Sequence, residues 1–199
     1  MGLKTHMSKF VTADCHFGHK NIIKYAKRPF SNVKEMDETM IANWNTVVHH
    51  NDEIHVVGDF AHCCSMEYAL NVIKRLNGTK HLILGNHDDE LALKMNDVRP
   101  GTWKSIKERS VIFIKNQKII LDHYAGRTWW HSYQGSAQLF GHTHGELPPY
   151  GKSFDCGVDC WNYTPVSEEQ IIQKLNSLPN AHAIQEKYRW DKSECEITK

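Results

Sequence analysis

The sequence predicts an α/β protein in which strands and helices alternate. Short apolar runs at residues 10–13, 54–57 and 80–84 end at glycine or at polar residues, as buried strands do. Residues 36–48 and 66–76 lie between these runs and carry apolar side chains every three or four positions, which is the period of an amphipathic helix. The resulting order of strand, helix, strand, helix, strand favours a layered α/β sheet.

The other elements of the first half are set by turn residues. Residues 22–25 predict a short helical stretch that ends at Arg28-Pro29, because proline disfavours helix in the residue before it. The helix over residues 66–76 is capped at Asn77-Gly78, where the chain returns to the next strand. For residues 88–100 we expect a short helix followed by a loop.

The second half of the sequence predicts a second sheet. Residues 111–114 and 119–121 are two apolar runs with a short polar turn between them, which indicates a hairpin. A strand at residues 153–158 is expected to join the same sheet. Ser167 then caps a helix with two glutamates in its first turn, and Pro179 ends this helix.

The length of the chain favours a single domain. Its net charge gives no overall electrostatic field that would attract nucleic acid. The chain has 199 residues, and its 24 Lys and Arg against 23 Asp and Glu give a net charge of +1. We expect residues 7–180 to form the domain. Residues 1–6 are expected to be a disordered leader or an expression remnant, and residues 181–199 a polar C-terminal tail.

The cysteines favour a cytoplasmic protein with reduced thiols. No secretory signal and no transmembrane run is found in the sequence, and two of the cysteines are adjacent, which is poor geometry for a structural bridge. A zinc-stabilised binding module built on cysteines fails on their spacing. The six cysteines are Cys15, Cys63, Cys64, Cys156, Cys160 and Cys195.

The most informative pattern is chemical, because five of the expected strands end in Asp, Asn or His. Loops on a rigid sheet bring such distant residues to one place. Oxygen and imidazole donors together suit divalent ions such as Mn, Fe, Zn or Mg. The residues at these strand ends are Asp14 and His16, Asp59, Asn86 and His87, Asp122 and His123, and His142 and His144.

These strand ends resemble the motifs of the calcineurin-like metallophosphoesterases. The matching stretches, in order, are Asp14-x-His16, Gly58-Asp59, Gly85-Asn86-His87-Asp88, His123 and Gly141-His142-Thr143-His144. They cover the first three quarters of the chain, and residues 14–19 and 28–30 resemble a small single-domain branch found in prokaryotes and phages. The resemblance implies a four-layer α-β-β-α sandwich of two mixed sheets flanked by helices.

The resemblance also implies two metal ions and the residues that hold them. Asp14, His16 and His144 would complete one site and Asn86, His123 and His142 the other, with Asp59 as the bridging carboxylate. The expected ion is Mn, with Fe, Ni, Zn or Mg as alternatives. A hydroxide held between the two metals would then attack a phosphate ester in line.

The same resemblance makes His87 the general acid that protonates the leaving group. One departure concerns the residues around it. Many phosphatases of the family follow the bridging Asp with a second Asp and an Arg, but His62 and Cys63 stand at these positions here. The group that orients His87 and the group that anchors phosphate must therefore come from elsewhere or be missing.

Candidate phosphate anchors are Arg127, which follows His123 by four residues, and more weakly His19, Lys20 and His62. Three aromatic residues between two of the motifs would stack on a base or pack in the core, and the sequence leaves both open: Trp129, Trp130 and Tyr133.

The leading hypothesis is a metal-dependent phosphoesterase, catalytic through Asp59 and His87, that acts on a phosphomonoester or a phosphodiester such as a nucleotide. A nuclease is the second hypothesis, weakened by the lack of a basic block. A non-catalytic scaffold that keeps the fold is the third, and His87 argues against it, because a scaffold needs no general acid. No membrane partner is expected.

Overall fold

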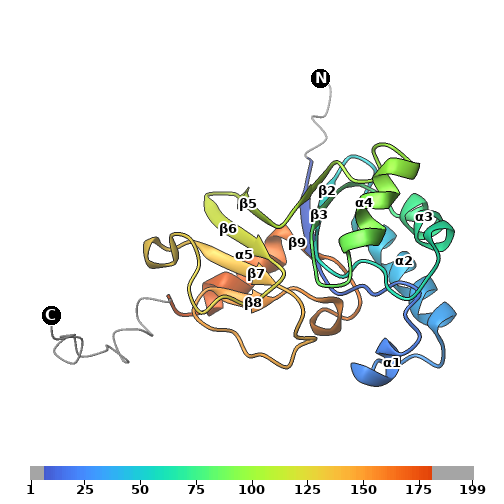
Figure 1. The fold of residues 1–199 in the computed structure, drawn as a ribbon. Helices are drawn as coiled ribbons and strands as arrows, with labels where there is room; N and C mark the ends of the chain where they lie inside the picture. Colours follow the sequence, from blue (N-terminus) through green and yellow to red (C-terminus); the bar gives the residue numbers. More distant parts are fainter. Residues whose placement is uncertain (1–6, 181–199) are drawn as a thin grey trace, which may run out of the picture.

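In the computed structural model, which describes residues 7–180, two mixed β-sheets pack against each other (Figure 1). The expectations for residues 1–6 and 181–199 lie outside the described residues. The α/β prediction is confirmed, and both sheets contain the strands that the apolar runs indicate.

The first sheet has five strands in the order β4-β3-β2-β1-β9. Strands β1 (Lys9–Thr12), β2 (Glu53–Val57), β3 (Thr79–Ile83) and β4 (Ser105–Lys107) are parallel, and β9 (Val166–Ser167) pairs antiparallel with β1. The parallel strands β1, β2 and β3 therefore end at the same edge of the sheet.

The second sheet has four strands in the order β5-β6-β7-β8. Strands β5 (Arg109–Ile114) and β6 (Gln117–Asp122) form the predicted antiparallel hairpin. Strands β7 (Ala137–Phe140) and β8 (Ser153–Asp155) run parallel to β6, so these three strands also end together. Residues 153–155 confirm the expected last strand, which is shorter than the run 153–158.

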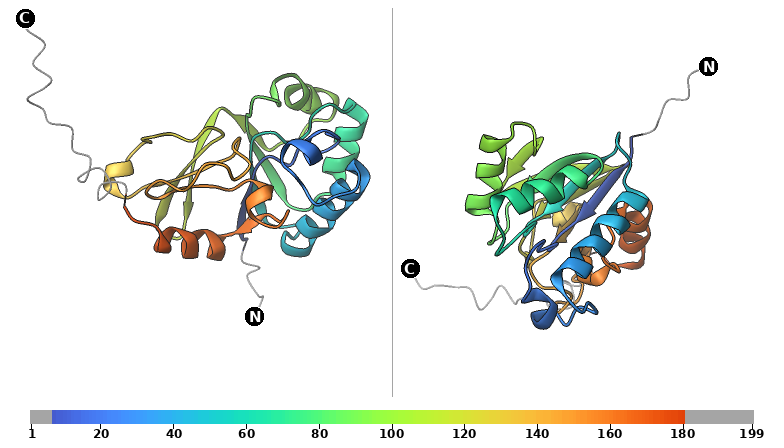
Figure 2. Two further views of the ribbon diagram at one scale, coloured as in Figure 1. Left: turned by 90° about the horizontal axis from the view of Figure 1, so that it is seen from below. Right: turned by 90° about the vertical axis from the view of Figure 1, so that its right-hand side faces the viewer.

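Three helices cover the outer face of the first sheet (Figures 1 and 2). They are α2 (Val33–Val47), α3 (Met66–Arg75) and α4 (Asp89–Val98), the last of which is longer than the short helix expected there. Helix α1 (Ile22–Tyr25) forms one turn, and α5 (Glu168–Ser177) begins with the predicted cap, which is a full capping box. Every helix within residues 7–180 is too short or too polar to cross a membrane.

Alternation along the strands divides the core into two main clusters. In β2, Ile54 and Val56 face the helices, whereas Val57 faces the second sheet. Side chains of α5, Ile171 and Leu175, join the cluster between the sheets. The strand period of two thus fixes which side chains meet the helices and which meet the other sheet.

The outer face of the second sheet is covered by loop residues. Ile120 of β6 packs there against Trp129, which is buried, and Tyr150. Phe113 of β5 remains 55% exposed on this sheet. The two short 3₁₀ turns, η1 (Ser132–Gln134) and η2 (Val158–Cys160), lie in the loops after β6 and β8. In the described residues, helices therefore cover the outer face of the first sheet, whereas loop residues cover that of the second.

Asp37 of α2 connects the helical layer to the loop after β1. Its buried carboxylate accepts hydrogen bonds from the amide of Gly18 (2.9 Å) and the hydroxyl of Tyr68 (2.6 Å). Burial raises the pKa of Asp37 to about 6, although both hydrogen bonds act in the opposite direction. The carboxylate is therefore a pH-dependent contact in the folded protein.

We predict that ionisation of Asp37 lowers the stability of the folded protein as the pH rises. A raised pKa in the folded state means that the protonated group stabilises the fold below pH about 4, and that this contribution is lost as the pH passes about 6. Asp37→Asn keeps the acceptor oxygen and removes the titration. The free energy of unfolding of the wild type, relative to Asp37→Asn, should fall by about 2 kcal/mol between pH 4 and pH 7.

The measurement is urea unfolding of both proteins in a chelator, at a series of pH values. Chelation removes the effect of metal binding, and the difference between the two proteins cancels the other titrating groups. A difference that stays constant over this range would show that Asp37 keeps an ordinary pKa.

Candidate metal centre

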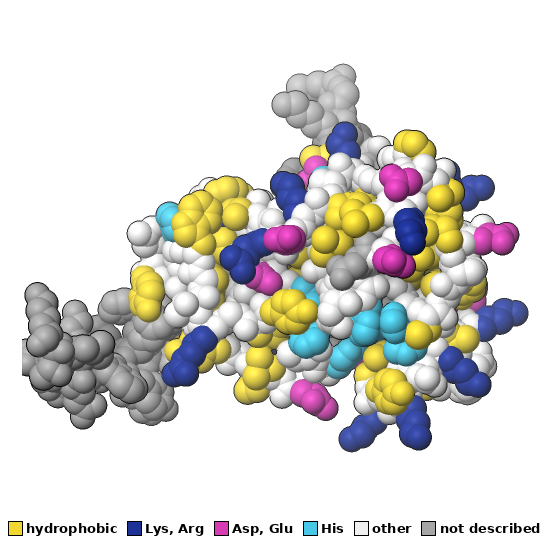
Figure 3. Space-filling view, in the orientation of Figure 1, with side chains coloured by type: hydrophobic (Ala, Val, Ile, Leu, Met, Phe, Trp, Pro, Cys, Tyr) yellow, Lys and Arg dark blue, Asp and Glu magenta, His cyan; other side chains and the backbone are white. Residues whose placement is uncertain are grey.

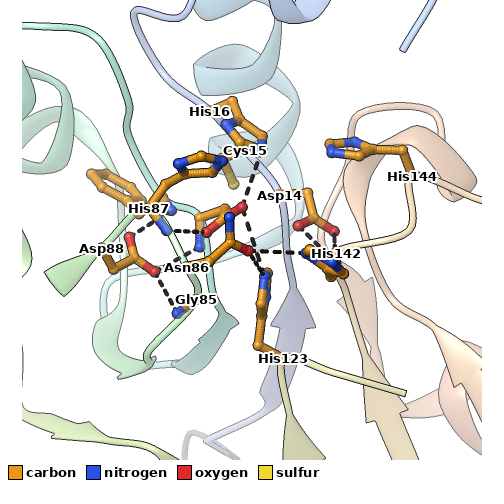
Figure 4. A network of polar contacts seen from close by, with 12 residues as sticks. Asp14, Cys15, His16, Gly85, Asn86, His87, Asp88, His123, His142 and His144 are labelled. Atoms are coloured by element: carbon orange, nitrogen blue, oxygen red, sulfur yellow. Dashed lines mark hydrogen bonds and ion pairs between the residues drawn. The ribbon is translucent and has the colours of Figure 1, made fainter. Parts of the chain in front are cut away.

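The predicted ligands converge where strands of both sheets end (Figure 4). Strands β1, β2 and β3 supply residues from the first sheet, and the loops after β6 and β7 supply residues from the second. The polar contacts described below join them into one network, so the strand-end pattern in the sequence corresponds to one location in the fold. The predicted ligands are Asp14, His16, Asp59, Asn86, His123, His142 and His144.

Asp14, His16 and His144 form the first group of donors. One ligand atom of each lies within 4.8 Å of the others. His16 is 2% exposed, and neither of its ring nitrogens has a hydrogen-bond partner. Buried nitrogen atoms without a hydrogen-bond partner are costly in a folded protein. A metal ion that accepts the lone pair of one of them fits this position. These residues therefore fit a metal ion.

A second group of donors contains Asp59 and shares Asp14 with the first group. Ligand atoms of Asp14, Asp59 and His123 lie within 4.8 Å of one another. The amide oxygen Oδ1 of Asn86 is 3.1 Å from Nε2 of His123 and 2.9 Å from Nδ1 of His142. Two imidazoles, an amide oxygen and carboxylates thus surround one point, which is a suitable donor set for a divalent ion.

Asp59 stands between the two groups. Its Oδ2 is 3.4 Å from Nε2 of His16 in the first group and 3.7 Å from Nε2 of His123 in the second. Its Oδ1 accepts a hydrogen bond from the backbone amide of His87 (3.0 Å). One carboxylate oxygen is therefore shared by both groups, while the other fixes the neighbouring loop.

Neighbouring groups orient the histidines. Nδ1 of His123 lies 2.9 Å from the carbonyl of Val57, which can only accept, so this nitrogen carries the proton and Nε2 keeps its lone pair. In the same way, Nδ1 of His144 lies 2.7 Å from Oδ2 of Asp159. Carboxylates and carbonyls in this role are typical partners of metal-binding histidines.

Arg28 secures Asp159 behind this histidine. The guanidinium is 4% exposed and donates two hydrogen bonds to the carboxylate of Asp159, at 2.8 and 2.9 Å. It also donates to the carbonyls of Asp14 (2.7 Å) and Cys15 (3.0 Å). Burial opposes ionisation of Asp159, but the hydrogen bonds from His144 and Arg28 hold its pKa below the usual value. Sequence reasoning missed both roles, although it singled out residues 28–30.

Asp155 supports the loop of His142 and His144 and was also missed. Its Oδ2 accepts from the hydroxyl of Thr143 (2.8 Å) and the amide of Gly145 (2.9 Å). Asp155 ends strand β8, so it repeats the same strand-end pattern as the ligands. The sequence therefore contained the signal that could have found it.

Asp88 joins the loops after β2 and β3. Its buried carboxylate accepts three backbone amides, those of Asp59 (2.6 Å), Gly85 (2.9 Å) and Phe60 (3.0 Å). Asp88 therefore fixes the backbone around Asp59 and in the loop of Asn86, two of the predicted ligands.

The backbone is strained at the ligands themselves. Five of the seven expected ligands have positive φ angles, between 48° and 68°. Such conformations cost about 1–3 kcal/mol each in residues other than glycine, and they concentrate at functional sites. The five residues are Asp14, His16, Asp59, His142 and His144.

Glycines in the motifs permit close approach of the strands. A Cβ on Gly58, whose φ is +89°, would lie 2.1 Å from Nδ1 of His123, and one on Gly85 would lie 2.3 Å from Oδ1 of Asp59. A side chain at either position would displace a ligand, which explains why glycine precedes the polar residues in these motifs.

The buried charges disfavour this arrangement unless a cation is present. Burial raises the pKa of Asp14 well above its usual value, and the nearby carboxylates of Asp155, Asp59 and Asp159 raise it further. Burial likewise lowers the pKa of His16. A divalent ion would stabilise the ionised carboxylate and the neutral imidazole together.

An open cavity of about 1120 Å³ lies over the two groups. Histidine side chains gather at this place on the surface (Figure 3). His87, His62 and His19 line the cavity, and the rings of His62 and His87 are 4.0 Å apart between centroids. His62 thus lies beside His87 at the position where the sequence departs from the family pattern.

Other candidates lie outside the cavity. Arg127 is exposed and is not among the residues that line it, so the structure does not support it as a phosphate anchor. Trp129 is buried and donates from its indole to the carbonyl of Ser136 (3.0 Å), which makes it a packing residue. Trp130 and Tyr133 are exposed but do not line the cavity either.

Three proteins similar to this chain come from an archaeon, a phage and a bacterium. The uncharacterized protein MJ1445 of Methanocaldococcus jannaschii is 34% identical over 174 residues, which are 83% of this chain and 90% of that protein. The Gene 66 protein of Mycobacterium phage L5 is 25% identical over 87% of this chain and 96% of that protein. No family model matches the sequence.

A solved structure shares the fold. The protein of unknown function AQ665 from Aquifex aeolicus matches with a TM-score of 0.65 and 24% identity, over 85% of this chain and 100% of that chain. This match supports the two-sheet architecture and carries no statement about activity.

We predict that metal ions stabilise the protein through Asp14. Without metal, Asp14→Asn should be at least as stable as the wild type, because it removes a buried charge that three other carboxylates disfavour. With Mn²⁺ at about 100 times its dissociation constant, the wild type should gain ~2.7 kcal/mol and the variant much less. Thermal melts in chelator and in Mn²⁺ test this. Equal metal-induced shifts in both proteins would contradict the assignment of Asp14 as a ligand.

Proposed function

The chain belongs to the protein family of MJ1445 from Methanocaldococcus jannaschii, and we propose that it is a phosphoesterase that uses two divalent metal ions. The proposed substrate is a phosphodiester or a phosphomonoester, and the proposed fold is the four-layer sandwich of the calcineurin-like phosphoesterases. The two mixed sheets, with helices α2, α3 and α4 on the first, support that fold.

The observation that carries the proposal is the position of Asp59 between two groups of donors. Its Oδ2 lies 3.4 Å from His16 and 3.7 Å from His123, which belong to different groups. A carboxylate in this position suits the bridge of a two-metal centre. A single-metal or purely structural site would not need a second group of ligands on its far side.

Each residue has a role in this proposal. When bound, the two ions would activate water and neutralise the charge on the phosphoryl oxygens. Asp14, His16 and His144 would hold one ion and Asn86, His123 and His142 the other, with Asp59 shared. Asp159 and the carbonyl of Val57 keep the proton of His144 and His123 on Nδ1, away from the metal. Mn is the proposed ion.

His87 is the proposed proton donor to the leaving group. Its backbone amide is fixed on Oδ1 of Asp59 (3.0 Å), and the residue lines the cavity above the bridge. Its ring packs 4.0 Å from that of His62 and 5.5 Å from that of His16, between centroids. These contacts support the proposal that the imidazole would lie beside a phosphate ester in the cavity and protonate the departing alkoxide.

The cavity is compatible with a substrate of nucleotide size. Its volume of about 1120 Å³ is slightly larger than that of ordinary ligand pockets, which span roughly 300–1,000 Å³. Tyr25 and Leu147 at its rim are 67% and 44% exposed and offer apolar surface to the part of the substrate beyond the phosphate.

We predict hydrolysis of p-nitrophenyl phosphate or of its bis ester in the presence of Mn²⁺. His87→Ala should lower kcat by about 10²–10⁴-fold while leaving the bound metal unchanged, because it removes a proton donor and no ligand. Asp59→Asn should lose both activity and one or both metals. The measurements are initial rates on both esters and elemental analysis of the same samples.

His50→Ala is the matched control, because His50 is an exposed histidine outside the residues that line the cavity. It should keep full activity. Cleavage of the bis ester would identify a phosphodiesterase, and cleavage of the monoester alone a phosphatase. A wild type that binds two metals and cleaves neither these esters nor a panel of nucleotides would count against the proposal and favour the scaffold.

A further inference from the structure

A third group of metal-binding side chains lies beside the proposed centre. One ligand atom from each of His19, His62 and Cys63 lies within 4.8 Å of the others. All three residues line the same cavity as His87, and the rings of His19 and His62 meet edge to face with their centroids 4.7 Å apart. None of the three is a ligand in the two-metal scheme above.

The fold holds this group together through two adjoining loops. The amide of Phe17 donates to the carbonyl of Phe60 (2.9 Å), and the amide of His62 donates to the carbonyl of Phe17 (3.2 Å). Gly18 lies against the second loop so closely that a Cβ there would be 2.5 Å from the Cβ of Cys64. The approach of the loops is therefore built into the backbone and does not depend on the three side chains.

One ring nitrogen of His19 is buried without a hydrogen-bond partner. The residue is 8% exposed, and its Nδ1 is buried without a hydrogen-bond partner. A buried polar nitrogen left in this state costs about 1–3 kcal/mol. An imidazole that packs against a second imidazole and a thiol, with an unpaired nitrogen, is suited to coordinate a cation.

We propose that His19, His62 and Cys63 bind a third divalent ion, and that this ion is zinc. A thiolate with two imidazoles is a soft donor set, which zinc favours and manganese does not. Three protein ligands leave one coordination position for water or substrate, as in catalytic zinc sites. Cys63 is exposed to the cavity, so the ion can enter from solvent.

The third ion would add positive charge next to His87, in a cavity that has few cationic side chains. Among the described residues that line the cavity, Lys27 is the one lysine or arginine. His62 and Cys63 stand where many phosphatases of the family that the motifs resemble carry an Asp and an Arg, and His62 is next to His87. An ion at this place would therefore hold a non-bridging phosphate oxygen. This consequence rests on the proposed function, whereas the metal site itself does not.

The variants are chosen so that the chain keeps its fold. Cys63→Ser replaces the thiol by a group of similar size, and Cys63→Gly suits the φ angle of +54° at this position. Cys64→Ser is the matched control, because it changes the neighbouring thiol, which is not part of the group. Asp59→Asn disturbs the two-metal centre and leaves the third group intact.

The experiment is titration of the full, metal-free chain with Co²⁺, followed by near-ultraviolet absorption. A thiolate bound to Co²⁺ gives a charge-transfer band, which oxygen and nitrogen ligands do not give. The wild type, Cys64→Ser and Asp59→Asn should show the band, and both Cys63 variants should lack it. Elemental analysis should find three ions in the wild type and two in Cys63→Ser.

Absence of the band from the wild type, or its loss with Cys64→Ser instead of Cys63→Ser, would overturn the third site. Since Asp59→Asn retains the band on this proposal, failure of the phosphoesterase activity does not affect this result. For the anchor role, calorimetric titration with inorganic phosphate should show about tenfold weaker binding to metal-loaded Cys63→Ser than to Cys64→Ser. Equal affinities would show that the third ion does not anchor phosphate.

Discussion

The constraint on which the site depends is the burial of several carboxylates at one edge of two sheets. Asp14, Asp59 and Asp155 are each less than 10% exposed, and they lie near Asp159. Against them, Arg28 is the one Lys or Arg that is buried within residues 7–180. A single guanidinium cannot compensate this much negative charge in a low dielectric. The ion-free protein is therefore electrostatically unfavourable at this place, and bound cations would remove the conflict.

Backbone strain at the same residues also indicates a functional site. Five expected ligands hold positive φ angles, and each such residue costs free energy that packing must offset. Asp88 and Asp155 offset part of it, because each uses a whole carboxylate to satisfy hydrogen-bond donors of the strained loops. Neither the positive φ angles nor the hydrogen bonds of Asp88 and Asp155 bury additional apolar surface. A protein that used this fold only as a binding scaffold would gain nothing from strained, charged loops aimed into a cavity, so the site geometry favours chemistry over scaffolding.

The sequence predicted the strands and the convergence of polar residues at their ends, because both follow from local rules. An apolar run, a glycine and a polar residue mark a strand end, and parallel strands bring such ends together. Strands β4 and β9 were missed because three and two residues are too few to show a period. The pairing of Arg28 with Asp159 was missed because 131 positions separate them, and no local pattern reports such a contact. Asp155 could have been found, since it ends a strand as the other ligands do.

On the third-site proposal, His62 and Cys63 at the position of a fixed cation would change how phosphate affinity is controlled. A guanidinium carries its charge permanently and is positioned by folding alone. Two imidazoles and a thiol carry no fixed positive charge at neutral pH, so their attraction for phosphate depends on an ion that they must first bind. The thiolate is also the ligand most exposed to oxidation, because Cys63 faces the cavity. Metal supply and redox state would thus act on substrate binding through the third group, while Asp59 and the two-metal centre remain unchanged.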